Sequence, residues 1–226
     1  GAMHRTAARM DCRYEIVAGV LSSDPDRSRR AAHDNGIARS YDTAHRMLDA
    51  EATRPDGAEV VAIMTPNDSH HEYATAALRH GCDVICDKPM TNTVAEAEEL
   101  VHIVRETGLV FCLTHNYTGY PMVRQARAMV ATGQLGDIRL VQVEYVQGGK
   151  AWEDDPDPAD GPVPWRFDPP KSGPSLVLAD IGTHAHNLVR FVTGLEVAEV
   201  LGLAGGQTDG EGQRLVGMVD EHVVAL

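Results

Sequence analysis

Short apolar runs alternate with amphipathic segments along the first half of the chain. Runs rich in β-branched residues predict strands at 14–21, 59–64, 83–86 and 109–113. Segments with helical spacing of apolar positions lie between them, bounded by capping residues and glycines, at 24–36, 43–51, 69–80 and 94–106. The run 59–64 is apolar after its first residue, which is typical of a strand buried on both faces of a parallel sheet. This order predicts an α/β fold with a doubly wound parallel sheet.

The pattern changes after residue 114. A helix is predicted at 121–132, and the alternating segment 138–147 is more typical of an antiparallel strand. Residues 148–175 contain most of the prolines and both tryptophans, and long ordered loops of this kind are often functional. A further helix is predicted at 178–192, followed by strands. We therefore expect two domains, at 1–114 and 115–226.

Composition and charge exclude several classes of function. The formal net charge is −13, and an acidic surface repels phosphate backbones and anionic lipid, so we expect no nucleic-acid or membrane partner. No apolar run is long enough to span a bilayer, and no signal segment opens the chain. The four cysteines lack CxxC spacing, which argues against a disulfide framework or a zinc knuckle. We expect a cytoplasmic protein.

Ligands of parallel sheets bind outside the carboxyl ends of the strands, so the turns that follow the strands are candidate sites. Lys88 follows a predicted buried strand and precedes a proline, and a partly buried lysine can donate hydrogen bonds or protons. An ordinary surface lysine would also fit this position. Asp180 and His184 are four residues apart, which places them on one face of a helix, where a carboxylate can make an imidazole a general base. That spacing also arises by chance, with a helix N-terminal charge and a surface histidine.

Metal and phosphate motifs are absent from the sequence. His70 and His71 are adjacent, so on a helix they point about 100° apart and chelate poorly. No HExxH and no GxGxxG motif occurs. We expect no catalytic metal.

Five segments together resemble one enzyme family. They are VVAIMTPNDSH (60–70), HGCDVICDKPM (80–90), HNY (115–117), GQLGDI (133–138) and DIGTH (180–184). Their order and spacing resemble the superfamily named after glucose-fructose oxidoreductase, inositol dehydrogenase and rhizopine catabolism (Gfo/Idh/MocA), whose members are NAD(P)-dependent oxidoreductases. The resemblance covers essentially the whole chain.

The resemblance implies an NAD(P)-binding Rossmann-type domain at 1–114. An α+β substrate domain with a large, mostly antiparallel sheet would follow at 115–226. The residues expected to contact NAD or NADP are Ser22, Ser23, Asp24, Thr65, Pro66, Asn67, His70, Asp87, Lys88 and Asn116. Those expected to contact the substrate are Lys88, Tyr117, Trp165, Arg166, Asp180 and His184. Asp87 stands where the family usually has Glu, which shortens the reach of that carboxylate.

The activity implied is oxidation of a secondary hydroxyl of a sugar or polyol by hydride transfer to the nicotinamide. His184 would take the hydroxyl proton, Asp180 would orient the sugar and His184, and Lys88 would stabilise developing alkoxide charge. Trp152, Trp165 and Arg166 would flank the sugar. Ser22 and Ser23, with two arginines following, would tolerate the 2′-phosphate of NADP, whereas Asp24 would favour NAD.

The family also begins with a strand and a Gly-rich turn that have no counterpart before the helix expected at 4–10. Its substrate sheet continues beyond the counterpart of residue 226. We therefore expect segments to be missing at both ends, and a homo-oligomer to form through the substrate-domain sheet when the protein is intact. Two alternatives stay open: a non-catalytic relative that binds a dinucleotide or a sugar, and an inactive fragment.

Overall fold

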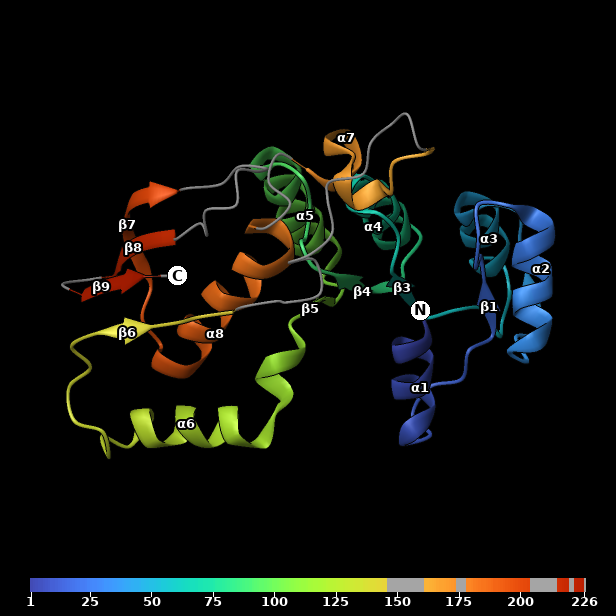
Figure 1. Cartoon of the computed structure of the whole chain (residues 1–226). Coiled ribbons are helices and arrows are strands. Elements are labelled where there is room, and N and C mark those ends of the chain that lie inside the picture. Colours follow the sequence, from blue (N-terminus) through green and yellow to red (C-terminus); the bar gives the residue numbers. More distant parts are fainter. Residues whose placement is uncertain (146–160, 174–177, 204–214, 220–221, 226) are drawn as a thin grey trace. The chain divides into compact units, whose positions relative to one another are not determined.

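The structure is a computed structural model that describes residues 1–145, 161–173, 178–203, 215–219 and 222–225 (Figure 1). The chain divides into two compact units. The first unit contains residues 1–65 and 69–113, and the second contains 66–68 and 114–226. Trp152 and most of the expected loop 148–175 lie outside the described residues.

Helices and strands alternate in the first unit. Its strands are β1 (Ala18–Gly19), β2 (Arg39–Ser40), β3 (Val60–Ile63), β4 (Asp83–Asp87) and β5 (Phe111–Thr114). Its helices are α1 (Ala2–Met10), α2 (Pro25–Asp34), α3 (Ala44–Glu51), α4 (His70–Arg79) and α5 (Val94–Thr107). β1 pairs with β2 in parallel, and β3 pairs with β4 in parallel. The predicted α/β alternation with parallel strands is confirmed.

In the described residues the strands of this unit form two sheets, so one continuous doubly wound sheet is not shown. β1 and β2 form a two-stranded sheet, and β3, β4 and β5 form a separate three-stranded sheet with β4 in the middle. The doubly wound order 3-2-1-4-5-6 places one strand between the counterparts of β1 and β3, and the described residues place none there. The predicted strand 14–21 is also too long, because β2 pairs with only two of its residues, Ala18 and Gly19.

Local sequence signals explain where the helices begin and end. Asp24 caps α2 by accepting a hydrogen bond from the backbone N–H of Arg27, and Pro25 occupies the first turn. Thr93 and Glu96 form a reciprocal capping box at the start of α5, and Gly108 ends that helix with a φ of 69°. The predicted helix boundaries of this unit are therefore close to those observed.

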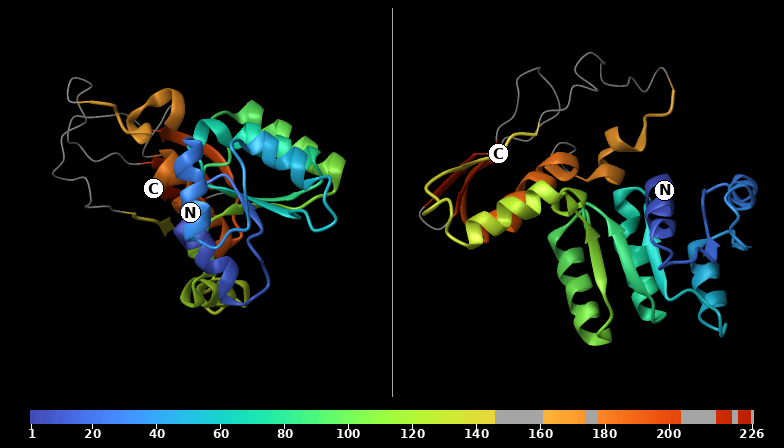
Figure 2. Two further views of the ribbon diagram at one scale, coloured as in Figure 1. Left: turned by 90° about the vertical axis from the view of Figure 1, so that its right-hand side faces the viewer. Right: turned by 90° about the horizontal axis from the view of Figure 1, so that it is seen from below.

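The core of the first unit lies between α4, α5 and the three-stranded sheet. α4 packs against β3, β4 and α5 (Figures 1 and 2). The buried side chains of this core are Leu48, Val61, Ile63, Ala74, Ala77, Leu78, Cys82, Val84, Cys86, Leu100 and Ile103. Both β4 and α4 contribute fully buried residues to this closely packed core. The turn that precedes α4 and the turn that follows β4 are therefore attached to rigid elements.

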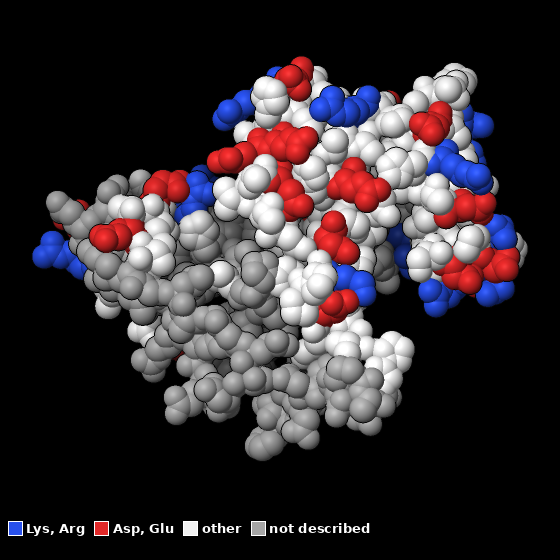
Figure 3. All heavy atoms as spheres, turned by 90° about the horizontal axis from the view of Figure 1, so that it is seen from above, with Lys and Arg blue, Asp and Glu red and all other residues white. Residues whose placement is uncertain are grey.

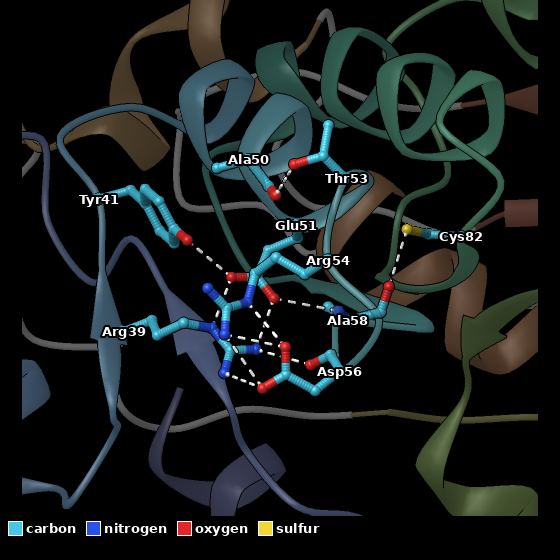
Figure 4. Close-up of polar contacts among 9 residues, drawn as sticks. All are labelled: Arg39, Tyr41, Ala50, Glu51, Thr53, Arg54, Asp56, Ala58 and Cys82. Atoms are coloured by element: carbon cyan, nitrogen blue, oxygen red, sulfur yellow. Dashed lines mark hydrogen bonds and ion pairs between the residues drawn. The ribbon is translucent and has the colours of Figure 1, made fainter.

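A buried ion pair joins β2, α3 and the chain before β3 (Figure 4). The Glu51 carboxylate accepts hydrogen bonds from Arg39 Nε (2.7 Å), Arg39 Nη2 (2.6 Å), the Tyr41 hydroxyl (2.7 Å) and the backbone N–H of Ala58 (3.1 Å). The hydrogen bonds from Arg39 lower the pKa of Glu51, although burial opposes them. A Cβ atom on Gly57 would lie 2.1 Å from the Glu51 carbonyl oxygen, so this close approach requires glycine.

The second unit contains helices and a mixed sheet. Its helical segments are η2 (Asn116–Gly119), α6 (Pro121–Ala131), η4 (Trp165–Phe167), α7 (Pro169–Ser172), a π-helical turn η5 (Leu178–Gly182) and α8 (Thr183–Thr193). Its strands are β6 (Val141–Gln142), β7 (Val197–Leu203), β8 (Leu215–Val219) and β9 (His222–Ala225), in the order β6-β9-β8-β7. α6 packs against α8 (Figures 1 and 2). Val189 of α8 is buried and packs against Val141 of β6 and Val197 of β7.

The described sheet of this unit differs from the expected large sheet. It has four strands, of which β7–β8 and β8–β9 are antiparallel and β6–β9 is parallel. The predicted strand 138–147 is too long within the described residues, because β9 pairs with only Val141 and Gln142. Residues 146 and 147 lie outside the described part of the chain.

Candidate functional site

The turns that follow β3 and β4 are joined by one histidine in the first unit. His70 is 1% exposed. Its Nδ1 lies 2.8 Å from the Pro89 carbonyl oxygen, and its Nε2 lies 3.0 Å from the Thr65 carbonyl oxygen. Thr65 also accepts a hydrogen bond from the Ser69 hydroxyl at 2.7 Å. The structure therefore brings together two of the turns that the sequence singled out.

Asp87 and Lys88 lie at the carboxyl end of β4, and both are half-buried. Asp87 Oδ1 is 2.8 Å from Nε2 of His4, which belongs to α1. The preceding residue, Cys86, is fully buried, and burial raises the pKa of its thiol to about 12. Cys86 is therefore a packing residue, and the polar chemistry of this turn is carried by Asp87 and Lys88.

The turn after β1 holds its polar side chains in local hydrogen bonds. The Ser22 hydroxyl accepts hydrogen bonds from the backbone N–H of Asp24 (3.1 Å) and from Arg27 Nε (2.7 Å). Asp24 Oδ1 accepts from the backbone N–H of Arg27 at 2.6 Å. Ser23 is exposed at the same turn. This turn therefore places a serine, a carboxylate and an arginine beyond the carboxyl end of a parallel strand.

His184 lies in a cage of aromatic rings in the second unit. It is 9% exposed and is the second residue of α8. Its ring contacts His115 and Tyr117 edge to face, with centroid distances of 5.5 Å and 4.8 Å. The Tyr145 ring stacks at 14° to it with a centroid distance of 6.3 Å. This enclosure restricts water and fixes the orientation of the imidazole.

The two tyrosines of the cage are linked to each other. The Tyr117 and Tyr145 hydroxyls form a hydrogen bond. This bond, burial and the neighbouring charges of Tyr145, Tyr120 and Asp180 raise the pKa of Tyr117 to about 12. Tyr117 is therefore a neutral hydrogen-bonding group at physiological pH.

The i, i+4 relation predicted for Asp180 and His184 needs a correction. Asp180 lies in the π-helical turn 178–182, whereas His184 lies in α8, so the two residues do not share one regular α-helix. Wider turns of this kind are frequent at functional sites. His115 and Tyr145 are site residues that were not expected from the sequence. The HNY segment contained the only signal for His115, and Tyr145 resembled an ordinary residue of an alternating strand.

The other candidate residues of the second unit differ in burial and in their contacts. The Asn67 side chain is buried and donates a hydrogen bond to the Ser172 carbonyl at 2.8 Å, whereas its neighbour Pro66 is half-buried. Asn116 is exposed at the start of η2. The Arg166 guanidinium lies 5.1 Å from the Trp165 ring centroid.

Surface charge and the types of side chain present show which ligands the described residues could bind. Acidic side chains gather on the face drawn in Figure 3, with Lys and Arg side chains between them. Among the described residues, no group of three or more His, Cys, Asp or Glu side chains could hold a metal ion. None of the described helices is long and apolar enough to cross a membrane. The polar groups at the ends of β1, β3 and β4 fit a dinucleotide, which binds at this edge of parallel sheets.

Comparison with known proteins identifies both units. The family described as "Oxidoreductase family, NAD-binding Rossmann fold" matches residues 1–127. The family described as "GFO/IDH/MocA C-terminal domain" matches residues 123–226. Together the two matches cover the whole chain.

Several relatives share this similarity. An uncharacterized oxidoreductase of Bacillus subtilis is 36% identical over 195 residues, which are 85% of this chain and 49% of that protein. Levoglucosan dehydrogenase of Pseudarthrobacter phenanthrenivorans is 31% identical over 77% of this chain and 42% of its own length. The chain thus spans about half the length of the curated relatives it matches.

Solved structures give the same result. The inositol dehydrogenase homolog of Azotobacter vinelandii, complexed with NADH and myo-inositol, has a TM-score of 0.87 and 30% sequence identity. That similarity covers 99% of this chain and 59% of the other. From the two family matches and these relatives, we conclude that the chain belongs to the Gfo/Idh/MocA oxidoreductase family.

Proposed function

We propose that the protein containing this chain is an NAD(P)-dependent oxidoreductase that oxidises a secondary hydroxyl of a sugar or polyol. The observation that carries this proposal is the cage around His184, in which Tyr117 and Tyr145 enclose a buried imidazole. Family membership supports the reaction class, and relatives named for levoglucosan and D-xylose support the substrate class.

Each catalytic residue has a proposed role. His184 takes the proton of the substrate hydroxyl as a general base, because its ring is held in one orientation by the cage. Asp180 orients the substrate and His184. Lys88 stabilises the alkoxide charge that develops as the C–H bond breaks. The nicotinamide, when bound, supplies the hydride acceptor. A secondary alcohol and oxidised dinucleotide thereby become a ketone, reduced dinucleotide and a proton.

The other candidate residues contribute to binding in this proposal. Ser22, Ser23 and Asp24 lie at the end of β1 and read the ribose nearest the adenine. Thr65, Pro66, Asn67, Asp87 and Asn116 line the dinucleotide. Tyr117, Trp165 and Arg166 contact the sugar, because aromatic faces pack against the apolar faces of pyranose rings. The residues 1–114 and 115–226 act as the cofactor and substrate domains, and the natural protein is a cytoplasmic homo-oligomer.

A substrate screen tests this proposal. The natural protein should reduce NAD⁺ or NADP⁺ with at least one of myo-inositol, levoglucosan, D-xylose and related polyols, followed by the absorbance of the reduced nicotinamide. Binding of NADH without turnover of any polyhydroxylated compound would favour a non-catalytic binding protein instead. Failure to bind either reduced dinucleotide would contradict the proposal at its first step.

A further inference from the structure

The ring of His70 lies within hydrogen-bonding distance of both the turn after β3 and the turn after β4. From this geometry we infer that His70 is a positioning residue with two separable tasks. Its Nδ1 bond to Pro89 holds the backbone beside Lys88, and its Nε2 bond to Thr65 holds the dinucleotide-binding turn. This inference rests on the function proposed above, since it assigns roles to turns of the same site.

The burial of His70 argues against direct contact between its side chain and a ligand. The residue is 1% exposed, and both of its ring nitrogens lie within hydrogen-bonding distance of backbone carbonyl oxygens. A carbonyl oxygen only accepts, so the ring donates in each bond that it makes. A neutral imidazole has one N–H and donates to Pro89 or to Thr65 at any moment, whereas the doubly protonated ring donates to both. His70 therefore acts on the site through the two turns, and does not contact the dinucleotide as the family resemblance implied.

The anchor of this connection is rigid. His70 is the first residue of α4, and Ala74, Ala77 and Leu78 of that helix are 0–1% exposed in the core. Pro89 is itself buried and follows Lys88 directly, so a fixed Pro89 carbonyl limits where the Lys88 backbone can lie. A displacement of about 1 Å at a catalytic group can cost about 100-fold in rate. The position of Lys88 is therefore sensitive to the Nδ1 bond.

Two substitutions separate the two bonds. In His70→Asn the amide nitrogen lies as far along the side chain as Nδ1, so the bond to Pro89 can be kept while the bond to Thr65 is lost. In His70→Gln the amide reaches the position of Nε2, so the bond to Thr65 can be kept while the bond to Pro89 is lost. The matched control is His71→Asn, because His71 is the next residue and makes its ion pair with Glu99.

The two variants should have opposite effects in the natural protein. H70Q should lower kcat about 10- to 100-fold and leave the Kd for NADH within about twofold. H70N should weaken NADH binding about 5- to 10-fold and leave kcat within about threefold. In a Lys88→Ala background, H70Q should cost almost nothing further in kcat, because its effect acts through Lys88. H71N should change neither quantity.

Other outcomes would overturn the inference. Equal losses in both variants, or a loss for H70Q that persists undiminished beside Lys88→Ala, would show a general structural role. If neither variant folds, histidine-selective ¹⁵N spectra of the unsubstituted protein test the inference. A ring N–H of His70 that is donated to a buried carbonyl should exchange slowly with solvent. A ring N–H that exchanges rapidly would contradict the inference. An unsubstituted protein that binds NADH but turns over no substrate would refute the proposed function, and the NADH affinities of the two variants would still test the Thr65 bond.

Discussion

Replacement of His184 by alanine should lower turnover by about 10²- to 10⁴-fold, the usual range for loss of a general base. The Kd for the dinucleotide should change little, because the aromatic cage around His184 lies in the second unit and the turns proposed to bind the dinucleotide lie mainly in the first. Steady-state kinetics with the best substrate of the screen, together with NADH titration, measures both quantities.

His186→Ala is the matched control for this experiment. His186 lies two residues further along α8 and is exposed, so its loss should leave turnover within about twofold. A His184→Ala variant with turnover close to that of the control would remove His184 from the mechanism. If the His184→Ala variant lost dinucleotide affinity but kept its turnover at saturating dinucleotide, His184 would have a role in cofactor binding and not in catalysis.

Replacement of Glu51 by alanine should reduce the free energy of unfolding by about 3–5 kcal/mol, because it breaks a buried ion pair from one side. The Glu51 side chain is 1% exposed, and its carboxylate accepts hydrogen bonds from Arg39, Tyr41 and Ala58. Its removal leaves the largely buried Arg39 with Asp56, whose carboxylate lies 3.6 Å away. Chemical denaturation followed by circular dichroism measures the loss.

The same helix offers a matched control in Asp49, an exposed carboxylate paired with His80 at 3.0 Å. Asp49→Ala should cost less than about 1 kcal/mol, as exposed pairs do. The effect of Glu51 should also depend on pH. Because the pKa of Glu51 is lowered by folding, its contribution is fully present above the pKa of an unfolded glutamate and is lost as the pH falls through the lower folded value. A Glu51→Ala difference that is small, or that grows on acidification, would contradict this account.

Helices and strands with strong local signals in the sequence were predictable. The segment 83–86 is observed as β4 at Asp83–Asp87, and 94–106 is observed as α5 at Val94–Thr107. Both have strong local signals, an apolar run in the strand and a capping box with a terminal glycine in the helix. Local chemistry and tertiary packing agree at these positions, so the predicted boundaries differ from the observed ones by a residue at most.

Strand length and side-chain contacts were not predictable in the same way. The run 14–21 has the composition of a strand, yet only Ala18 and Gly19 find a pairing partner in the described residues. Strand length depends on a neighbour that local sequence does not encode. The stacking of Tyr145 on His184 and the bonds of His70 to Thr65 and Pro89 likewise join residues through tertiary structure, so spacing alone could not find them.

In the proposed reaction a hydride passes from a substrate carbinol carbon to the nicotinamide, and His184 takes the proton. The most direct measurement uses a substrate that is deuterated at that carbon. The substrate is a compound oxidised in the screen, or myo-inositol or levoglucosan. The natural protein should transfer the deuterium to C4 of the nicotinamide, detected by NMR of the reduced dinucleotide, and should yield the corresponding ketone. Reduced dinucleotide without deuterium, or a dinucleotide-bound protein that oxidises no deuterated polyol, would contradict the account.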